Sequence, residues 1–311
     1  MRKFRRCITG LLLAAGVFLH TGCTESEIST TAETESAVGA SSAEQGPQHA
    51  GSGAGTDVLA QTPDALHRAL KAKNPGYNGG GKFEVRNGQI VAADLRETGI
   101  EDLAPLRGLP LLALDLYGNA VADLDPLREM TLQALYLEET PVQDLTPLSG
   151  MALQVLYLSS TDVTNLEPLQ GMPLRELNLV ETSVADLSPL TGAPLVMLWL
   201  NETPVDDLNP LRGLPLVSLT IKGTRVEDLS PLREMPQLER LHLVSTPVTD
   251  LSPLEGLHLT RLVFTPDRIT RGIEAVRDMS TLREIGTRFD TETQSLMTPV
   301  QFWQMYDEER L

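Results

Sequence analysis

Residues 174–194 have the sequence LRELNLVETSVADLSPLTGAP, and variants of this stretch follow one another along the chain. The phrase Asp-Leu-x-Pro-Leu recurs at 102–106, 123–127, 144–148, 186–190, 207–211, 228–232 and 250–254, and at 165–169 with Asn165 replacing Asp. Successive phrases start 21 residues apart, until the inserted Gln237 makes the last interval 22. A fixed interval of this length predicts a solenoid in which each repeat forms one coil.

Most coils also contain a Leu-x-Leu pattern, such as Leu177-Asn178-Leu179, followed three residues later by Thr or, in one coil, by Asn119. Side chains alternate along a strand, so the two leucines point to one face and the middle residue to the other. Stacked parallel strands would share one continuous leucine core. We expect each Thr hydroxyl to bond a neighbouring coil's backbone, and each Asp to act as the N-cap of a 3₁₀ turn.

The repeats at residues 91–264 resemble the short leucine-rich repeats of internalin-type bacterial proteins, with Thr where those usually have Asn. The resemblance implies an α/β solenoid with a parallel concave sheet, short 3₁₀ or irregular segments on the convex side, and helical caps at both ends. The stretches Asn74-Pro75-Gly76-Tyr77 and Phe302-Trp303-x-x-Tyr306-Asp307 are similar to leucine-rich modules of large bacterial Ser/Thr protein kinases, although no kinase motif is present.

The flanking segments are predicted to cap the solenoid. Residues 62–90 would form a helix starting at Thr62-Pro63, and then a hairpin turning at Asn87-Gly88. Residues 265–311 would form a C-terminal repeat and cap: a long convex helix across 269–279, a last strand at 282–285, and a terminal helix starting at Thr298-Pro299.

The N-terminus is predicted to direct export. Residues 1–22 combine a basic start with an apolar stretch too short to span a bilayer, as in a signal peptide. The following Cys23 resembles the lipidated cysteine of bacterial lipoproteins, which implies a lipid anchor; ordinary signal cleavage is the alternative. Residues 23–61 are acidic and contain very few large apolar side chains, so we expect a disordered tether.

Composition argues against several classes of function. The formal net charge of −17 would repel the phosphates of nucleic acids and anionic lipid surfaces. Membrane contact is therefore expected only through the N-terminal lipid. The five His show no metal-ligand spacing, and no nucleophile–base set can be identified. We expect neither enzymatic activity nor a cofactor.

The concave face of the sheet holds the candidate binding residues. Its outward positions collect aromatic and charged side chains, namely Tyr117, Tyr136, Tyr157, Met197, Trp199, Lys222, Arg240 and His242. Acidic residues lie near its N-terminal end and basic residues near the other. Aromatic residues dominate many protein interfaces, but strands also favour them without any binding role. We expect the aromatic rings to lie in water unless a partner covers them.

These features predict a non-catalytic protein-binding module, tethered in the bacterial cell envelope, that binds a protein partner through its concave face. Two other roles stay open: a sensory or regulatory module of a Ser/Thr kinase signalling system, and a structural or adhesive surface protein. A carbohydrate partner also stays open, because Tyr and Trp rings stack on sugars.

Overall fold

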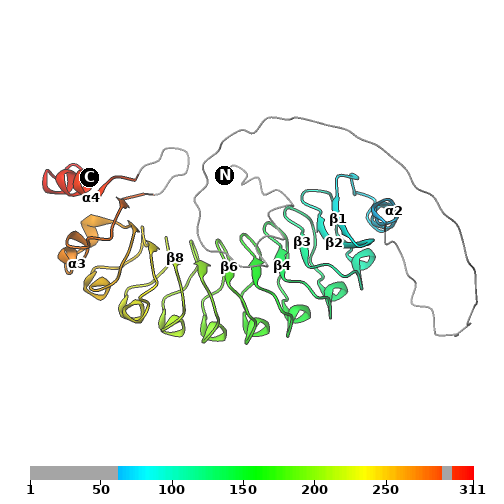
Figure 1. Cartoon of the computed structure of the whole chain (residues 1–311), viewed down its shortest axis with the longest axis horizontal. Coiled ribbons are helices and arrows are strands. Elements are labelled where there is room, and N and C mark those ends of the chain that lie inside the picture. The colour runs from blue at the N-terminus through cyan, green and yellow to red at the C-terminus, as the bar shows by residue number, and fades with distance from the viewer. Residues whose placement is uncertain (1–61, 289–295) are drawn as a thin grey trace, which may run out of the picture.

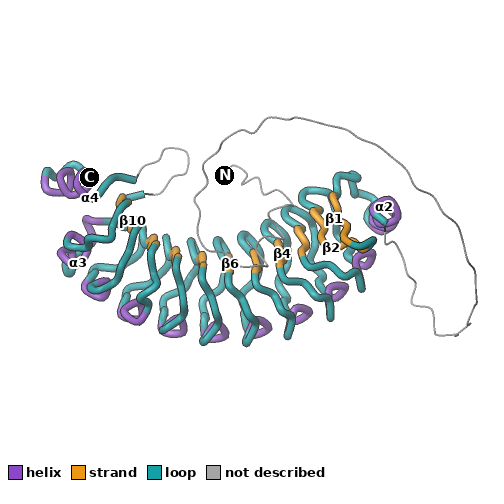
Figure 2. The backbone as a smooth tube through the Cα atoms, viewed as in Figure 1, coloured by secondary structure: helices purple, strands orange, loops and turns teal. Residues whose placement is uncertain are grey.

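The protein is a curved solenoid in the computed structural model, which describes residues 62–288 and 296–311. Its strands form a single sheet in chain order, parallel throughout except for the antiparallel pair β1–β2. The sheet lines the concave side and short 3₁₀ turns line the convex side (Figures 1 and 2). The predicted leucine-rich solenoid is therefore confirmed. The strands are β1 Lys82–Arg86, β2 Gln89–Asp94, β3 Ala113–Asp115, β4 Ala134–Tyr136, β5 Val155–Tyr157, β6 Glu176–Asn178, β7 Met197–Trp199, β8 Ser218–Thr220, β9 Arg240–His242, β10 Arg261–Val263 and β11 Glu284–Gly286.

The Asp-Leu-x-Pro-Leu phrases form the convex turns. In each, the Asp or Asn side chain accepts a hydrogen bond from the amide two residues later, as Asp186 does from Ser188 at 2.8 Å. The N-cap position is the Leu after the Asp, so the acid lies one residue earlier than expected but still satisfies a free amide. The 3₁₀ turns are η2 Ala104–Leu106, η3 Asp125–Leu127, η4 Thr146–Leu148, η5 Glu167–Leu169, η6 Ser188–Leu190, η7 Asn209–Leu211, η8 Ser230–Glu234, η9 Ser252–Leu254 and η10 Pro266–Arg268.

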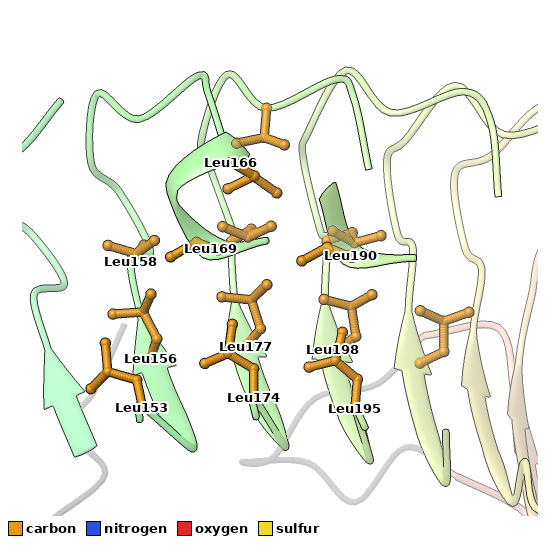
Figure 3. Close-up of a cluster of buried hydrophobic side chains, with 14 of the residues drawn as sticks. Leu153, Leu156, Leu158, Leu166, Leu169, Leu174, Leu177, Leu190, Leu195 and Leu198 are labelled. Carbon is orange, nitrogen blue, oxygen red and sulfur yellow. The ribbon is translucent and has the colours of Figure 1, made fainter. Parts of the chain in front are cut away.

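The core is a stack of leucines between sheet and turns (Figure 3). Leu156, Leu177 and Leu198 occupy equivalent places on neighbouring strands and are fully buried. The buried Thr column behaves differently from the prediction. Each hydroxyl donates to a carbonyl of its own coil, as Thr182 does to Leu179 at 2.7 Å. The expected bond to a neighbouring coil is wrong because the carbonyl three residues back lies within reach of a short side chain.

The N-terminal cap has the expected elements. Helix α2 (Pro63–Lys73) starts at Thr62, whose side chain accepts from the Ala65 amide. The hairpin between β1 and β2 turns at Asn87 and Gly88, both with positive φ, as a two-residue turn requires. The buried Asn74 accepts hydrogen bonds from the amides at 101 and 102, so it joins the end of α2 to the first coil.

The C-terminal cap departs from the prediction in one element. Helix α3 covers only Ile273–Arg277 rather than 269–279. The helix cannot start earlier because the amides of Thr270 and Arg271 donate hydrogen bonds to the carbonyl of Thr249 in the preceding coil. Gly272 then has a left-handed backbone conformation. Strand β11 lies slightly later than predicted.

The terminal helix α4 (Pro299–Asp307) begins as predicted, with a capping box between Thr298 and Gln301. Its buried face packs onto the last coil, where the Phe264 and Phe302 rings lie 5.7 Å apart. No helix in the described ranges is long and apolar enough to cross a membrane. The predicted signal peptide, Cys23 and the tether to residue 61 lie outside the described residues.

Candidate functional site

The residues between the paired leucines form one line across the concave face, which we call the central column. Parallel pairing aligns Asp94, Asp115, Tyr136, Tyr157, Asn178, Trp199, Thr220 and His242 on successive strands. The predicted alignment of these side chains is therefore confirmed. Met197 and Arg240 lie two residues before the central column on their own strands, and Tyr117 and Lys222 lie two residues after it.

Tyr136, Tyr157 and Trp199 make up the aromatic cluster at the middle of the face. The rings of Tyr136 and Tyr157 meet edge to face with centroids 5.1 Å apart. Tyr157 also contacts Trp199, at 5.6 Å between centroids, although the β6 strand lies between them. The Tyr157 hydroxyl donates to Glu176 at 2.8 Å on β6.

The expectation that these rings lie in water is wrong for two of them. Tyr136 and Tyr157 are only 5% and 4% exposed, whereas Trp199 is partly exposed. Together with small neighbours they form a second apolar cluster, separate from the leucine core; its other members are Ala92, Ala113, Ala134 and Val155. Alanine and valine in the adjoining column leave room for the large rings, so part of the concave face is itself packed apolar surface.

Tyr117 lies beside this cluster. Its hydroxyl donates to Glu139 at 2.7 Å, and this bond raises the pKa of Tyr117 to about 12. The side chain is partly exposed, and its partner Glu139 lies just after the C-terminal end of β4. Met197 is also partly exposed, on the same strand as Trp199.

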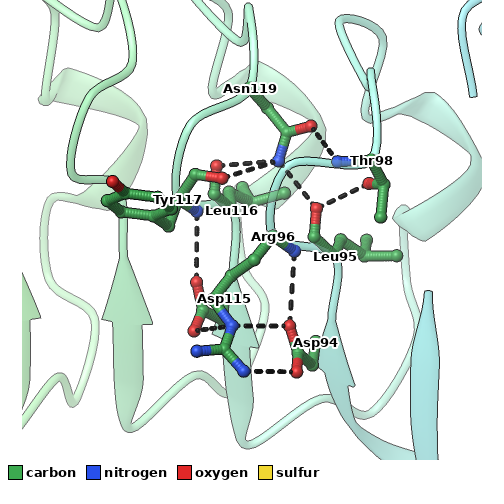
Figure 4. Close-up of polar contacts among 8 residues, drawn as sticks. All are labelled: Asp94, Leu95, Arg96, Thr98, Asp115, Leu116, Tyr117 and Asn119. Atoms are coloured by element: carbon green, nitrogen blue, oxygen red, sulfur yellow. Dashed lines mark hydrogen bonds and ion pairs between the residues drawn. The ribbon is translucent and has the colours of Figure 1, made fainter. Parts of the chain in front are cut away.

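An ion network occupies the N-terminal end of the face (Figure 4). The Arg96 guanidinium contacts Asp94 at 2.7 Å and Asp115 at 3.2 Å. Burial alone would raise the pKa of Asp94, but hydrogen bonds from Arg96 outweigh it and hold that pKa below its usual value. Burial raises the pKa of Asp115 to about 7, and nearby Glu138 adds to the rise. One guanidinium therefore pairs with two buried carboxylates, and it offsets the cost of burying the negative charge less completely for Asp115 than for Asp94.

Basic residues gather at the other end. Lys222 pairs with Glu202 at 2.9 Å, and Arg261 pairs with Glu284. Arg240 lies on β9 between them and is partly exposed. Burial lowers the pKa of His242 to about 4, and Lys222 contributes to the shift. The imidazole of His242 is accordingly neutral at pH 7.

Two further features of the molecule were not predicted from the sequence. Asn119, which interrupts the Thr column, accepts from the amides of Thr98 (3.2 Å) and Ile100 (3.0 Å) and donates to the Leu95 carbonyl (2.7 Å). It thus makes the bond between coils that was expected of the threonines (Figure 4).

The second such feature is a column of residues with left-handed backbone, each located three residues after the central-column residue of strands β2 to β9. It consists of Glu97, Gly118, Glu139, Ser160, Glu181, Glu202, Gly223 and Ser245. Most L-residues avoid this conformation, and Glu is not among the residues that tolerate it best. The two glycines at equivalent positions were the sequence signal that could have revealed it.

Other chemistry was not found in the part of the chain that the structure describes. Within residues 62–288 and 296–311, no group of His, Cys, Asp and Glu side chains is arranged to hold a metal ion. An open cleft of about 510 Å³ lies on the convex side between η9 and α3. It contains none of the predicted binding residues.

No protein-family model and no curated protein sequence matches the chain. Its structure is similar to internalin C2 of Listeria monocytogenes, with 28% identity, a TM-score of 0.54, and coverage of 64% of this chain and 92% of that one. A second Listeria monocytogenes internalin, inlF, matches with 20% identity, a TM-score of 0.53, and coverage of 75% and 78%.

A plant protein shows the same fold at greater distance. The leucine-rich-repeat ectodomain of the Arabidopsis thaliana receptor kinase GASSHO1/SCHENGEN3, solved in complex with CASPARIAN STRIP INTEGRITY FACTOR 2, has 17% identity and a TM-score of 0.51. The match covers 66% of this chain and 31% of the plant chain. These similarities agree with the repeats described above, and the chain has the leucine-rich repeat solenoid fold.

Proposed function

We propose that the protein is a non-catalytic binding module that holds a protein partner on its concave face. The observation that carries this proposal is the aromatic cluster, which lies on the concave side of the sheet rather than in the leucine core. A solenoid needs apolar side chains only between sheet and turns. Apolar and aromatic residues on the opposite face, with Trp199 and Met197 partly exposed, match the composition of protein-binding surfaces.

The fold supports the same proposal by analogy, since the plant ectodomain was solved in complex with CASPARIAN STRIP INTEGRITY FACTOR 2. We further propose that the chain is exported and lipid-anchored through Cys23, as its N-terminal sequence suggests. Mass spectrometry of the mature N-terminus tests the anchor: diacylglycerol on Cys23 supports it, and an unmodified N-terminus at another residue contradicts it.

Photo-crosslinking in the native cells tests the binding face. Benzoylphenylalanine would replace Met197 on the concave face or, as a matched control, Gln170, which is exposed at the end of η5 on the convex side. We expect a discrete protein adduct from position 197 only, and its loss when Trp199→Ala is added. Adducts from both positions or from neither would overturn the proposal.

A further inference from the structure

The two ends of the concave face carry opposite charges. At its N-terminal end, the acids Asp94, Asp115 and Glu138 outnumber two basic residues: Arg96 contacts Asp94 and Asp115, and Lys82 pairs in register with Asp94. Burial raises the pKa of Asp115 to about 7 even though the guanidinium lies 3.2 Å away. A buried carboxylate with incomplete compensation is stabilised by any further cation brought beside it.

The opposite end has the reverse charge. Lys222, Arg240 and Arg261 lie on or beside three successive strands, and Glu202 and Glu284 pair with the first and last of them. Among residues 62–288 and 296–311, Arg240 forms no ion pair, and it is partly exposed. An anion placed above β9 would therefore find a guanidinium that no carboxylate of the described residues neutralises.

Between the two ends the face is mostly apolar. Tyr136, Tyr157 and Trp199 line the central column there, with Val155 and Met197 beside them. The one charged side chain among them, Glu176, accepts the hydrogen bond of Tyr157. A ligand that matched this surface would carry opposite charges at its ends and apolar groups between them.

The dimensions restrict the form of that ligand. From β3, which carries Asp115, to β9, which carries Arg240, there are six strand-to-strand steps. At ~4.8 Å per step the two side chains are about 29 Å apart, which an extended polypeptide spans in about nine residues. The concave strands β3 to β11 are three residues long. Asp115 and the aromatic rings lie in the central column, and Met197 and Arg240 lie two residues before it, so the residues that would contact the ligand form a strip about 7 Å wide. A strip of that width suits one extended chain better than a helix, whose diameter is about 10–12 Å.

We infer that the partner presents an extended polypeptide segment that crosses the concave strands, with a Lys or Arg near Asp115, an Asp or Glu near Arg240 about nine residues away, and apolar side chains between them. This inference rests on the proposed function and specifies the chemistry of its partner. A neutral glycan would stack on the rings but would leave both charged ends of the face without a counterpart.

Selection from a displayed library of random peptides against the full chain tests the inference. The peptides should be about 15 residues long, enough to span the face. We expect the enriched peptides to share a basic and an acidic residue about nine positions apart. Arg240→Glu should weaken their binding at least about tenfold, and replacing the peptide's acidic residue by Lys should restore it. Arg107→Glu, at an exposed convex position, is the matched control and should change nothing.

The outcomes separate this inference from the proposed function. If the peptides bind through Trp199, so that Trp199→Ala removes binding, but share no charge spacing and ignore Arg240→Glu, the inference is wrong and the proposed function stands. If the peptides ignore both Trp199→Ala and Arg240→Glu, the inference is wrong, and the crosslinking at position 197 still decides the proposed function. Failure to enrich any peptide would overturn the inference alone, because crosslinking at position 197 decides the function independently. If Arg240→Glu unfolds, as judged by circular dichroism, Arg240→Gln replaces it, with a smaller loss expected.

Discussion

Tyr157 and Trp199 touch although their strands are not neighbours: their ring centroids lie 5.6 Å apart, across the strand that carries Asn178. Two strand-to-strand steps separate their backbones by about 9.6 Å. The side chains must therefore lean toward each other above Asn178, whose side chain is short enough to permit the contact. The aromatic cluster is thus a packed unit that spans four strands, from β4 to β7.

The first prediction concerns the stability of this cluster. Tyr157→Ala should lower the free energy of unfolding by about 2 kcal/mol or more, because it removes a buried ring with contacts on both sides. Trp199→Ala should lower the free energy of unfolding by a smaller amount. The loss in the double variant should be about 0.5–1.5 kcal/mol smaller than the sum of the two single losses, because both substitutions remove the same ring contact. Urea unfolding measures all three values.

Val180→Ala serves as a control, because this partly exposed side chain lies on the same face outside the cluster and should cost little. Equal losses at 157 and 180 would contradict a packed aromatic cluster.

The second prediction compares Asn119 with the threonine column. Asn119→Ala leaves the buried amides of Thr98 and Ile100 without their acceptor, and each unpaired amide should lower the free energy of unfolding by about 1–3 kcal/mol. Thr182→Val removes one donor from the Leu179 carbonyl, which still accepts from the Thr182 amide at 3.2 Å, so the loss should be about 1 kcal/mol or less. Thermal unfolding should rank the Asn119 variant clearly below the Thr182 variant; the reverse order would mean that Asn119 does not join the two coils.

The third prediction uses the left-handed column. Glu181→Gly should stabilise the protein by about 0.5–1 kcal/mol, because glycine adopts a φ of 58° without the cost borne by an L-side chain. The bond from Ser160 to Glu181 is exposed, and losing it should cost little. The matched control is Glu167→Gly in η5, where φ is not positive and the same change should destabilise. A lower melting temperature for Glu181→Gly would show that the column stores no such strain.

The fourth prediction is a pH dependence. Because burial lowers the pKa of His242 to about 4, from 6.5 in the unfolded chain, the folded protein binds fewer protons than the unfolded protein between these values. The stability that this neutral imidazole confers is complete above pH 6.5 and is lost as the pH falls toward 4. His242→Gln should therefore flatten the fall in urea midpoint across this range. The carboxylates titrate in the unaltered protein and in His242→Gln alike, so their contribution cancels when the two are compared. If the two plots of urea midpoint against pH were parallel, His242 would not be buried in its neutral form.

The solenoid could be predicted from the amino-acid sequence alone. The repeating phrase fixed the coil length, the Leu-x-Leu pattern placed the strands and the core, and Pro in each phrase kept the convex turns short. The alignment of Tyr136, Tyr157 and Trp199 in one column followed from the same periodicity. These inferences succeeded because each depends on local geometry that is repeated from coil to coil.

The contacts between side chains of different coils could be seen only in the three-dimensional structure. Whether Tyr157 leans over Asn178, whether Arg96 reaches Asp115, and which coil Asn119 bonds all depend on distances between residues on separate strands. Periodicity gives the column of a side chain but not its rotamer. Burial of Tyr136 and Tyr157 likewise depends on what packs around them, including the small residues in the adjoining column, and alternation along a strand specifies only which face they occupy.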